Sequence, residues 1–152
     1  SETMKELFES EIEGCFLYSR HWNPSNKYLS DAISALENSE ASQITSSGIS
    51  AIACTILQIC QQGDQIISSR TIYGGTYALF KNILPKFGIS VKFVDILDLN
   101  TIDKNITSKT KMVYCESISN PLLDVSDLPE LSKITKKYSI KLVVDNTLAL
   151  WQ

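Results

Sequence analysis

Two carboxylates, Glu116 and Asp145, each follow a short apolar run that predicts a β-strand. A carboxylate in such a place is costly unless it meets a hydrogen-bond donor or a cation. Either residue could therefore hold a protonated ring nitrogen of a ligand. The alternative, which the spacing alone favours, is a surface turn or the N-cap of the next helix. The same two interpretations apply to Asn120 and Thr147, which follow them closely.

A second candidate group lies at the start of a predicted helix. Ser47, Gly48 and Ile49 open a segment with apolar residues at helical intervals as far as Cys60. The first backbone N–H groups of a helix and the helix dipole suit a phosphate, and Gly48 would let the anion approach closely. Ser and Gly at this place are also ordinary cap residues, so the motif alone does not identify a ligand.

Two further segments carry polar groups that could reach a ligand. Tyr73 begins the motif YGGT between a predicted strand and a predicted helix, where its ring could cover a ligand or pack on the domain. Tyr18, Ser19 and Arg20 lie in an N-terminal arm, and arginine is well suited to phosphate. Such an arm can reach a neighbouring subunit, although a solvated arginine is the simpler interpretation.

These residues must be positioned by elements that alternate along the chain. The motif NPSN at 23–26 is typical of a turn. Predicted helices cover 28–36, 49–60, 80–87, 100–106 and 128–138, and predicted strands cover 65–70, 91–96, 111–117 and 142–144. Strands separated by helices predict an α/β fold with a mainly parallel sheet covered by helices. We expect an N-terminal arm over 1–27 and an α/β domain over 28–152.

The composition limits the classes of function. The 152 residues include 14 Lys and Arg against 17 Asp and Glu, and 43% are apolar, as in an ordinary globular domain. A net charge of −3 argues against nucleic acid or a membrane surface as partner. Neither a long apolar run nor a signal peptide is evident. Four cysteines without a C-x-x-C pair lack a zinc signature and suggest reduced thiols, so we expect a cytoplasmic location.

A single histidine, His21, removes most Ser-His-Asp and Cys-His mechanisms. Any chemistry in this chain therefore depends on a cofactor. A nucleotide-binding domain is a poor alternative because neither a G-x-G-x-x-G motif nor a P-loop lysine motif is present.

Taken in order, the motifs resemble those of the Cys/Met-metabolism enzymes that use pyridoxal 5′-phosphate. That family includes cystathionine γ-synthase, cystathionine lyases, O-acetylhomoserine sulfhydrylase and methionine γ-lyase. The resemblance runs from about residue 3 to 147 and rests on YSR at 18–20 with NP at 23–24, TSSG at 45–48 with AI at 51–52, GD at 63–64, YGGT at 73–76, ES at 116–117 with NPL at 120–122, and VVDNT at 143–147. It implies part of the large domain of a fold-type I enzyme.

The resemblance also implies roles in holding the cofactor. Gly48 and Ile49 would give backbone N–H groups to its phosphate. Tyr73 would stack on the pyridine ring and assist proton transfer, and Asp145 would pair with the pyridinium nitrogen. Asn120 would lie near the 3′ oxygen of the ring.

Supporting and intersubunit roles follow from the same resemblance. Glu116 and Thr147 would be supporting neighbours of the ring. Tyr18 and Arg20, with Ser19 between them, would bind the phosphate of the adjacent subunit's cofactor. The family's active sites are built across a dimer interface, so the resemblance implies a homo-oligomer, a dimer of dimers.

The choice within the family rests on two features. The run from Tyr18 to Pro24 looks most like the methionine γ-lyase branch, which implies a sulfur amino acid substrate and α,γ-elimination to a thiol, ammonia and a 2-oxo acid. Gly75, in contrast, is common among cystathionine enzymes and sulfhydrylases. The alternative functions are therefore cystathionine γ-synthase or lyase and O-acetylhomoserine sulfhydrylase.

The sequence departs from the family pattern at its end. The family's Schiff-base lysine follows Asp-Asn-Thr by some two dozen residues in a Ser-x-Thr-Lys segment, whereas this sequence ends at Gln152. We therefore expect the amino-terminal part of a longer enzyme, inactive by itself. A catalytically dead paralogue that acts as a binding or regulatory module is the alternative.

Overall fold

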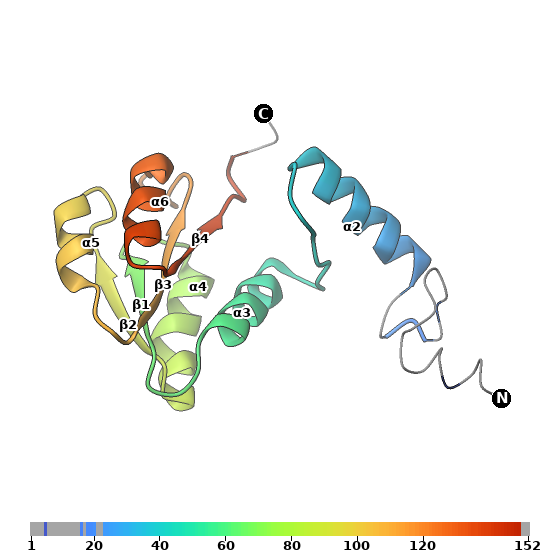
Figure 1. Cartoon of the computed structure of the whole chain (residues 1–152), viewed down its shortest axis with the longest axis horizontal. Helices are drawn as coiled ribbons and strands as arrows, with labels where there is room; N and C mark the ends of the chain where they lie inside the picture. Colours follow the sequence, from blue (N-terminus) through green and yellow to red (C-terminus); the bar gives the residue numbers. More distant parts are fainter. Residues whose placement is uncertain (1–4, 6–15, 17, 21–22, 150–152) are drawn as a thin grey trace. The chain divides into compact units, whose positions relative to one another are not determined.

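The structure is a computed structural model that describes residues 5, 16, 18–20 and 23–149. The described residues up to Thr45 and those from Ser46 onward form two separate compact units (Figure 1). The N-terminal unit contains helix α2 (Pro24–Leu36), and the other unit contains the sheet.

Helix α2 begins earlier than expected, and the predicted turn at 23–26 is wrong. Asn23 is the N-cap, and its Oδ1 accepts a hydrogen bond from the backbone N–H of Asn26 at 2.9 Å. Pro24 occupies the first turn, where its missing N–H costs no hydrogen bond. Asn and Pro favour turns and helix starts for the same physical reasons, so the motif alone does not separate the two.

Four strands of the described chain form one parallel sheet in the order β2-β1-β3-β4, which confirms the predicted fold class. Their bounds are β1 Gln65–Ser69, β2 Ser90–Val94, β3 Thr110–Glu116 and β4 Lys141–Asp145. β2 and β3 flank β1 on opposite sides, so the chain reverses its direction of travel across the sheet between them. Ligands of open α/β sheets bind at such a point, beyond the carboxyl ends of the strands.

Helices cover both faces of the sheet (Figure 1). Successive strand residues point to opposite faces, so Ile66 and Tyr114 belong to one core and Ile67 and Cys115 to the other. The first core is closed by α3 and the helical segment after β1, and the second by α5 and α6. The bounds are α3 Gly48–Ile59, α4 Gly74–Ala78, η1 Leu79–Ile83, η2 Leu84–Phe87, α5 Leu99–Asn105 and α6 Leu128–Lys137.

The helical segment after β1 begins at Gly74, earlier than the predicted start at residue 80. Two glycines have low helix propensity and conceal this start in the sequence. The segment then passes through a π-helical turn, η1, and a 3₁₀ turn, η2, which contains Pro85. It ends at Gly88, whose φ of 71° is left-handed and therefore suits glycine.

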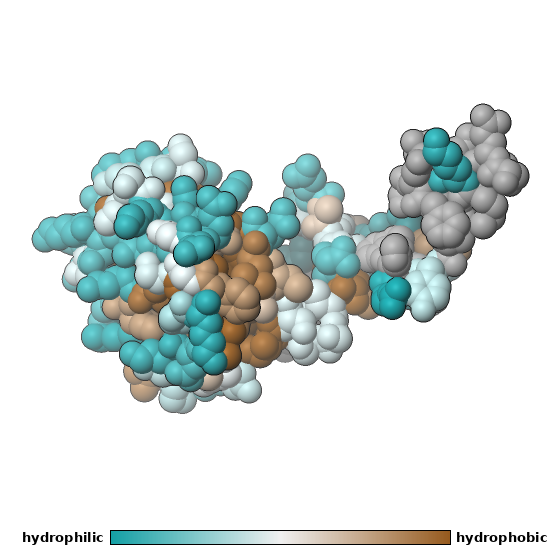
Figure 2. Space-filling model, turned by 90° about the horizontal axis from the view of Figure 1, so that it is seen from below, coloured by the Kyte–Doolittle hydropathy of each residue, from teal (hydrophilic) through white to brown (hydrophobic). Residues whose placement is uncertain are grey.

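Apolar residues also reach the surface of the sheet-containing unit. Figure 2 shows them gathered in a patch on the face that it displays. The exposed large apolar side chains of this unit are Ile49, Leu57, Tyr73, Tyr77, Ile83, Phe87, Leu97, Leu122, Leu123, Val125, Tyr138 and Leu148. None of the helices within the described ranges is long and apolar enough to cross a membrane.

Candidate functional site

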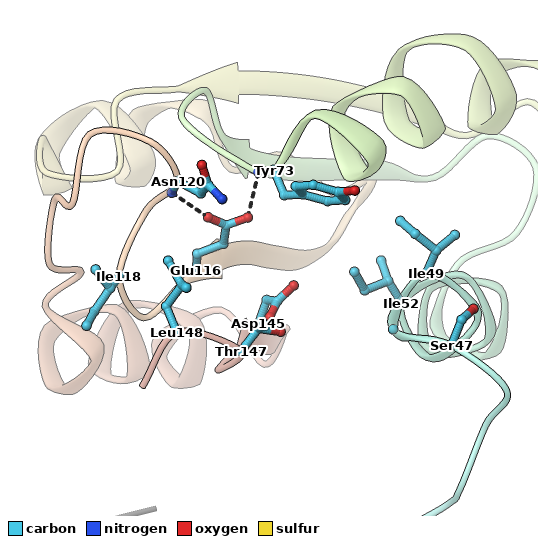
Figure 3. Close-up of a pocket in the computed structure, with 11 residues that line it drawn as sticks. Ser47, Ile49, Ile52, Tyr73, Glu116, Ile118, Asn120, Asp145, Thr147 and Leu148 are labelled. Atoms are coloured by element: carbon cyan, nitrogen blue, oxygen red, sulfur yellow. Dashed lines mark hydrogen bonds between the residues drawn. The ribbon is translucent and has the colours of Figure 1, made fainter. Parts of the chain in front are cut away.

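A pocket of about 390 Å³ lies where the predicted site residues of the sheet-containing unit meet (Figure 3). It is formed by the start of α3 and the segments that follow β1, β3 and β4, all within the sheet-containing unit. The residues that line it are Ser47, Gly48, Ile49, Ile52, Tyr73, Glu116, Ile118, Asn120, Asp145, Thr147 and Leu148. A volume of this size suits a small organic ligand or cofactor.

The start of α3 supplies backbone N–H groups to this pocket. Ser47 is the N-cap, with its Oγ accepting from the backbone N–H of Ser50 at 3.2 Å, so the predicted cap is confirmed. The first intrahelical hydrogen bond runs from the N–H of Ala51 to the carbonyl of Ser47. The N–H groups of Gly48 and Ile49 precede it and therefore have no carbonyl partner within the helix. The first turn of α3 contains neither Asp nor Glu. An anion would therefore meet the positive end of the helix dipole without repulsion from that turn.

Tyr73 lies between β1 and α4, and its ring projects into the pocket region (Figure 3). The side chain is 53% exposed, so its face is accessible to a ligand. A Cβ atom built on Gly75 would lie 2.6 Å from Cε1 of Tyr73, so the ring packs closely over the glycine. The Tyr73 backbone N–H donates to Oε1 of Glu116 at 2.6 Å.

Glu116, the last residue of β3, is only 5% exposed. Its second carboxylate oxygen, Oε2, accepts the backbone N–H of Asn120 at 2.9 Å. The interpretation favoured by the spacing, a surface turn or a helix N-cap, is therefore wrong for this residue. Its carboxylate is buried because two backbone donors satisfy it.

Asp145 ends β4 and lies beside Glu116 in the strand register. Its Oδ1 accepts from the backbone N–H of Thr147 at 3.0 Å and also from the Thr147 hydroxyl. Its Oδ2 accepts from the Tyr114 hydroxyl at 3.3 Å. Two donor residues thus orient the carboxylate while it lines the pocket.

Tyr114 is a site residue that the sequence reasoning missed. It is fully buried, and burial together with the nearby carboxylate of Asp145 raises the pKa of its hydroxyl well above the usual range. Its hydroxyl therefore stays protonated and able to donate to Asp145. The period of two along a strand places Tyr114 on the same face as Glu116, and that signal could have identified it.

The three arm residues belong to the N-terminal unit. Tyr18, Ser19 and Arg20 are exposed there, and the guanidinium carbon of Arg20 lies 5.0 Å from the centroid of the Tyr18 ring. This distance is within the range of a cation–π contact. Their predicted role at a phosphate remains a prediction. His21, Trp22 and Cys15 lie outside the described residues, as do Leu150 and Trp151 of the C-terminal tail.

The pocket combines groups that recognise different ends of one ligand. The start of α3 suits an anion, Asp145 suits a cationic ring nitrogen, and Tyr73 offers an aromatic face. Among the described residues no group of three His, Cys, Asp or Glu side chains could hold a metal ion. Together these groups suit a flat heterocycle that carries a phosphate.

Comparison with known proteins supports the same ligand. The model of the Cys/Met metabolism PLP-dependent enzymes matches residues 1–150. The chain is 40% identical to methionine gamma-lyase of Arabidopsis thaliana, over 97% of the chain and 35% of that protein. It is 41% identical to homocysteine synthase of Schizosaccharomyces pombe, over 87% of the chain and 31% of that protein.

A solved structure shows a similar fold. It is described as a putative O-acetylhomoserine (thiol)-lyase from Campylobacter jejuni with pyridoxyl-lysine 5′-monophosphate, and it matches with a TM-score of 0.85 and 34% identity. The match covers 88% of this chain and 33% of that one. The chain thus spans about a third of the length of the relatives it matches. It belongs to the Cys/Met-metabolism family of pyridoxal-phosphate-dependent enzymes.

Proposed function

We propose that the full-length protein is a carbon–sulfur lyase or transferase that binds pyridoxal phosphate in the pocket between α3 and the strand ends. The observation that carries this proposal is the meeting of three elements in one cavity. A helix start without acidic residues, an exposed aromatic ring and an oriented carboxylate all line it.

The residues present fit the cofactor. The N–H groups of Gly48 and Ile49 would hold its phosphate, and open space around Gly48 leaves room for the anion, since a Cβ there would meet nothing within 4 Å. Asp145 would pair with the ring nitrogen, and Tyr73 would cover the ring face. Asn120 and Thr147 would complete the wall near the 3′ oxygen and behind Asp145.

When bound, pyridoxal phosphate supplies an electron sink that stabilises the negative charge left after the substrate loses its α proton. Asp145 would keep the ring nitrogen protonated, and the donors from Tyr114 and Thr147 would hold that carboxylate in place. Tyr73 would fix the plane of the ring, and its hydroxyl would assist proton transfer. The apolar side chains of Ile49 and Ile52 would exclude water from one side of the pocket.

For the substrate, we place a methionine γ-lyase-like reaction first. It is the α,γ-elimination of a sulfur amino acid to a thiol, ammonia and a 2-oxo acid. The support is the motif from Tyr18 to Pro24 and the similarity to methionine gamma-lyase over 97% of the chain. The similarity to homocysteine synthase keeps a transferase of the cystathionine γ-synthase or O-acetylhomoserine sulfhydrylase type as the second candidate.

For assembly, we propose a cytoplasmic homo-oligomer, a dimer of dimers, in which the arm of one subunit completes the site of another. Tyr18 and Arg20 are exposed and lie within cation–π distance of each other, and together with Ser19 they could meet the phosphate of a neighbour's cofactor. The exposed apolar side chains of the sheet-containing unit are typical of a surface that contacts protein.

The test is Asp145→Ala in the full-length protein. The wild type should show a visible band of bound pyridoxal phosphate that borohydride abolishes, and it should release thiol and a 2-oxo acid from methionine. Asp145→Ala should lose turnover while its far-ultraviolet circular dichroism is unchanged. The matched control is Asp103→Asn, at a half-buried residue of α5 that pairs with Lys137 and does not line the pocket, and it should stay active.

Different results would redirect the proposal. Near-normal turnover of Asp145→Ala would refute the role of this carboxylate. Thiol addition to an acyl homoserine without elimination from methionine would favour the transferase. A full-length protein that binds no pyridoxal phosphate would support the catalytically dead binding module instead.

A further inference from the structure

We propose that Glu116 is a positioning residue that fixes the aromatic wall and the amide wall of the pocket at the same time. This inference rests on the proposed function, because those walls are the ones that would face the cofactor. The resemblance treats Glu116 only as a neighbour of the ring, whereas the structure gives its carboxylate two defined partners.

The two partners come from different segments of the chain. Oε1 accepts the N–H of Tyr73 at 2.6 Å, in the link between β1 and α4. Oε2 accepts the N–H of Asn120 at 2.9 Å, in the loop after β3 (Figure 3). Glu116 therefore joins two segments that lie 43 and 4 residues away from it in sequence.

Only a carboxylate can make both bonds at this place. Each partner is a backbone donor, and an ionised carboxylate offers an acceptor on each oxygen. A glutamine of the same size offers one acceptor, and its NH₂ group would face the second backbone N–H. Bonds from N–H groups to a charged acceptor are also the stronger kind, and burial of Glu116 increases their contribution.

Neighbouring hydrogen bonds hold the backbone at the end of β3, next to Glu116. The Ser126 hydroxyl donates to the carbonyl of Glu116 at 2.7 Å, and the N–H of Ser117 donates to the carbonyl of Asp145 at 3.0 Å. Glu116 is thus held by the sheet, and its side chain carries that rigidity to Asn120 and Tyr73. The backbone N–H groups of Tyr73 and Asn120 thus share one carboxylate as their acceptor.

The experiment compares the full-length wild type with Glu116→Gln by three measurements. Hydrogen exchange should show loss of protection at one of the two N–H groups, Tyr73 or Asn120, whichever faces the glutamine NH₂. Pyridoxal phosphate titration should show about tenfold weaker affinity, since about one charge-assisted hydrogen bond is lost. The visible circular dichroism of the bound cofactor should also decrease at saturation, because the ring is less well oriented.

Two further variants complete the design. Glu130→Gln removes an exposed carboxylate that pairs with Lys133 on α6 and should match the wild type in each measurement. Glu116→Asp keeps the charge but is one methylene shorter, so it can reach only one donor. Glu116→Asp should lose protection at one of the two N–H groups, and it can be compared with the wild type if Glu116→Gln does not fold.

The outcomes separate this inference from the proposed function. Unchanged exchange at Tyr73 and Asn120 in folded Glu116 variants overturns the inference, whether or not the protein binds pyridoxal phosphate. If exchange at Tyr73 and Asn120 changes but the affinity and dichroism of pyridoxal phosphate do not, Glu116 has no effect on the ligand and that part of the inference is overturned. A wild type without cofactor binding refutes the proposed function, and the role of Glu116 toward the ligand fails with it.

Discussion

The ring of Tyr73 lies so close over Gly75 that a Cβ atom on this glycine would be 2.6 Å from Cε1 of the ring and 3.3 Å from Cδ1. Tyr73 has no side-chain hydrogen bond that caps α4, so packing and the backbone bond to Glu116 define its position. The absence of a side chain at residue 75 is therefore what permits the observed orientation of the ring.

We predict that Gly75→Ala displaces the Tyr73 ring and weakens pyridoxal phosphate binding by the full-length protein about tenfold, which corresponds to loss of one aromatic contact. Gly74→Ala is the matched control, since it lies in the same helical turn and its Cβ would meet nothing within 4 Å. That control should bind pyridoxal phosphate like the wild type and should not lower the stability of the protein. Fluorescence titration and thermal unfolding measure both effects, and equal binding by the two variants would contradict the prediction.

Substitution of a second glycine, Gly48, tests the proposed phosphate site without disturbing the fold. Gly48 opens α3, and a Cβ there would meet no protein atom within 4 Å. We expect Gly48→Val to fold normally and to weaken the binding of pyridoxal phosphate more than that of pyridoxal, because the added bulk opposes only the phosphate. The measurement is the affinity of wild type and variant for each of the two compounds, with inorganic phosphate as a competitor. Equal losses for both compounds would place the phosphate elsewhere.

The sequence predicted those parts of the site that depend on local chemistry. Ser47 and Gly48 form the helix start that their types indicated, and Asp145, predicted to follow a strand over 142–144, is the last residue of β4. The parallel sheet also followed from the alternation of strands and helices. The helix start and the strand end are each set by residues within a few positions of one another, and the sheet follows from the order of such local elements.

The features that the sequence did not predict depend on distant partners. Glu116 is buried because Tyr73, far from it in sequence, supplies a donor. Tyr114 enters the site because parallel pairing brings β4 and Asp145 beside β3. The start of α4 was missed because Gly74 and Gly75 oppose helix formation locally, while the core contacts of Phe80 and Leu84 hold the helical segment on the sheet.

The Tyr114 hydroxyl donates a hydrogen bond to Asp145, and its removal tests whether this bond orients the Asp145 carboxylate. Tyr114→Phe deletes the donor to Oδ2 and leaves the buried ring, which packs against Phe80 at 4.9 Å between centroids. We predict about 1 kcal/mol lower stability and a change in the pH dependence of the bound cofactor's absorbance. Tyr28→Phe, at an exposed tyrosine of α2, should change neither quantity. An unaltered absorbance titration in Tyr114→Phe would show that Thr147 alone orients Asp145.

The buried cysteines predict a loss of stability at high pH. Burial raises the pKa of the Cys115 thiol from 9.0 to about 11, and burial together with Asp64 does the same for Cys60. A folded-state pKa above the unfolded value means that the stabilising contribution is complete below about pH 9 and is lost as the pH rises through about 11. Urea unfolding at a series of pH values should therefore show stability falling across this interval.

Substitution of single cysteines separates this effect from other titrations. Cys115→Ala should make the fall between pH 9 and 11 shallower by up to about 1.4 kcal/mol per pH unit, whatever its stability at neutral pH. Cys54→Ala, at the exposed thiol of α3, should leave the slope unchanged. Alkylation of the native protein at pH 8 should likewise modify Cys54 and leave Cys60 and Cys115 unmodified, because burial limits both access and thiolate formation. Rapid modification of Cys115, or equal slopes for the two alanine variants, would contradict the buried, protonated state of this thiol.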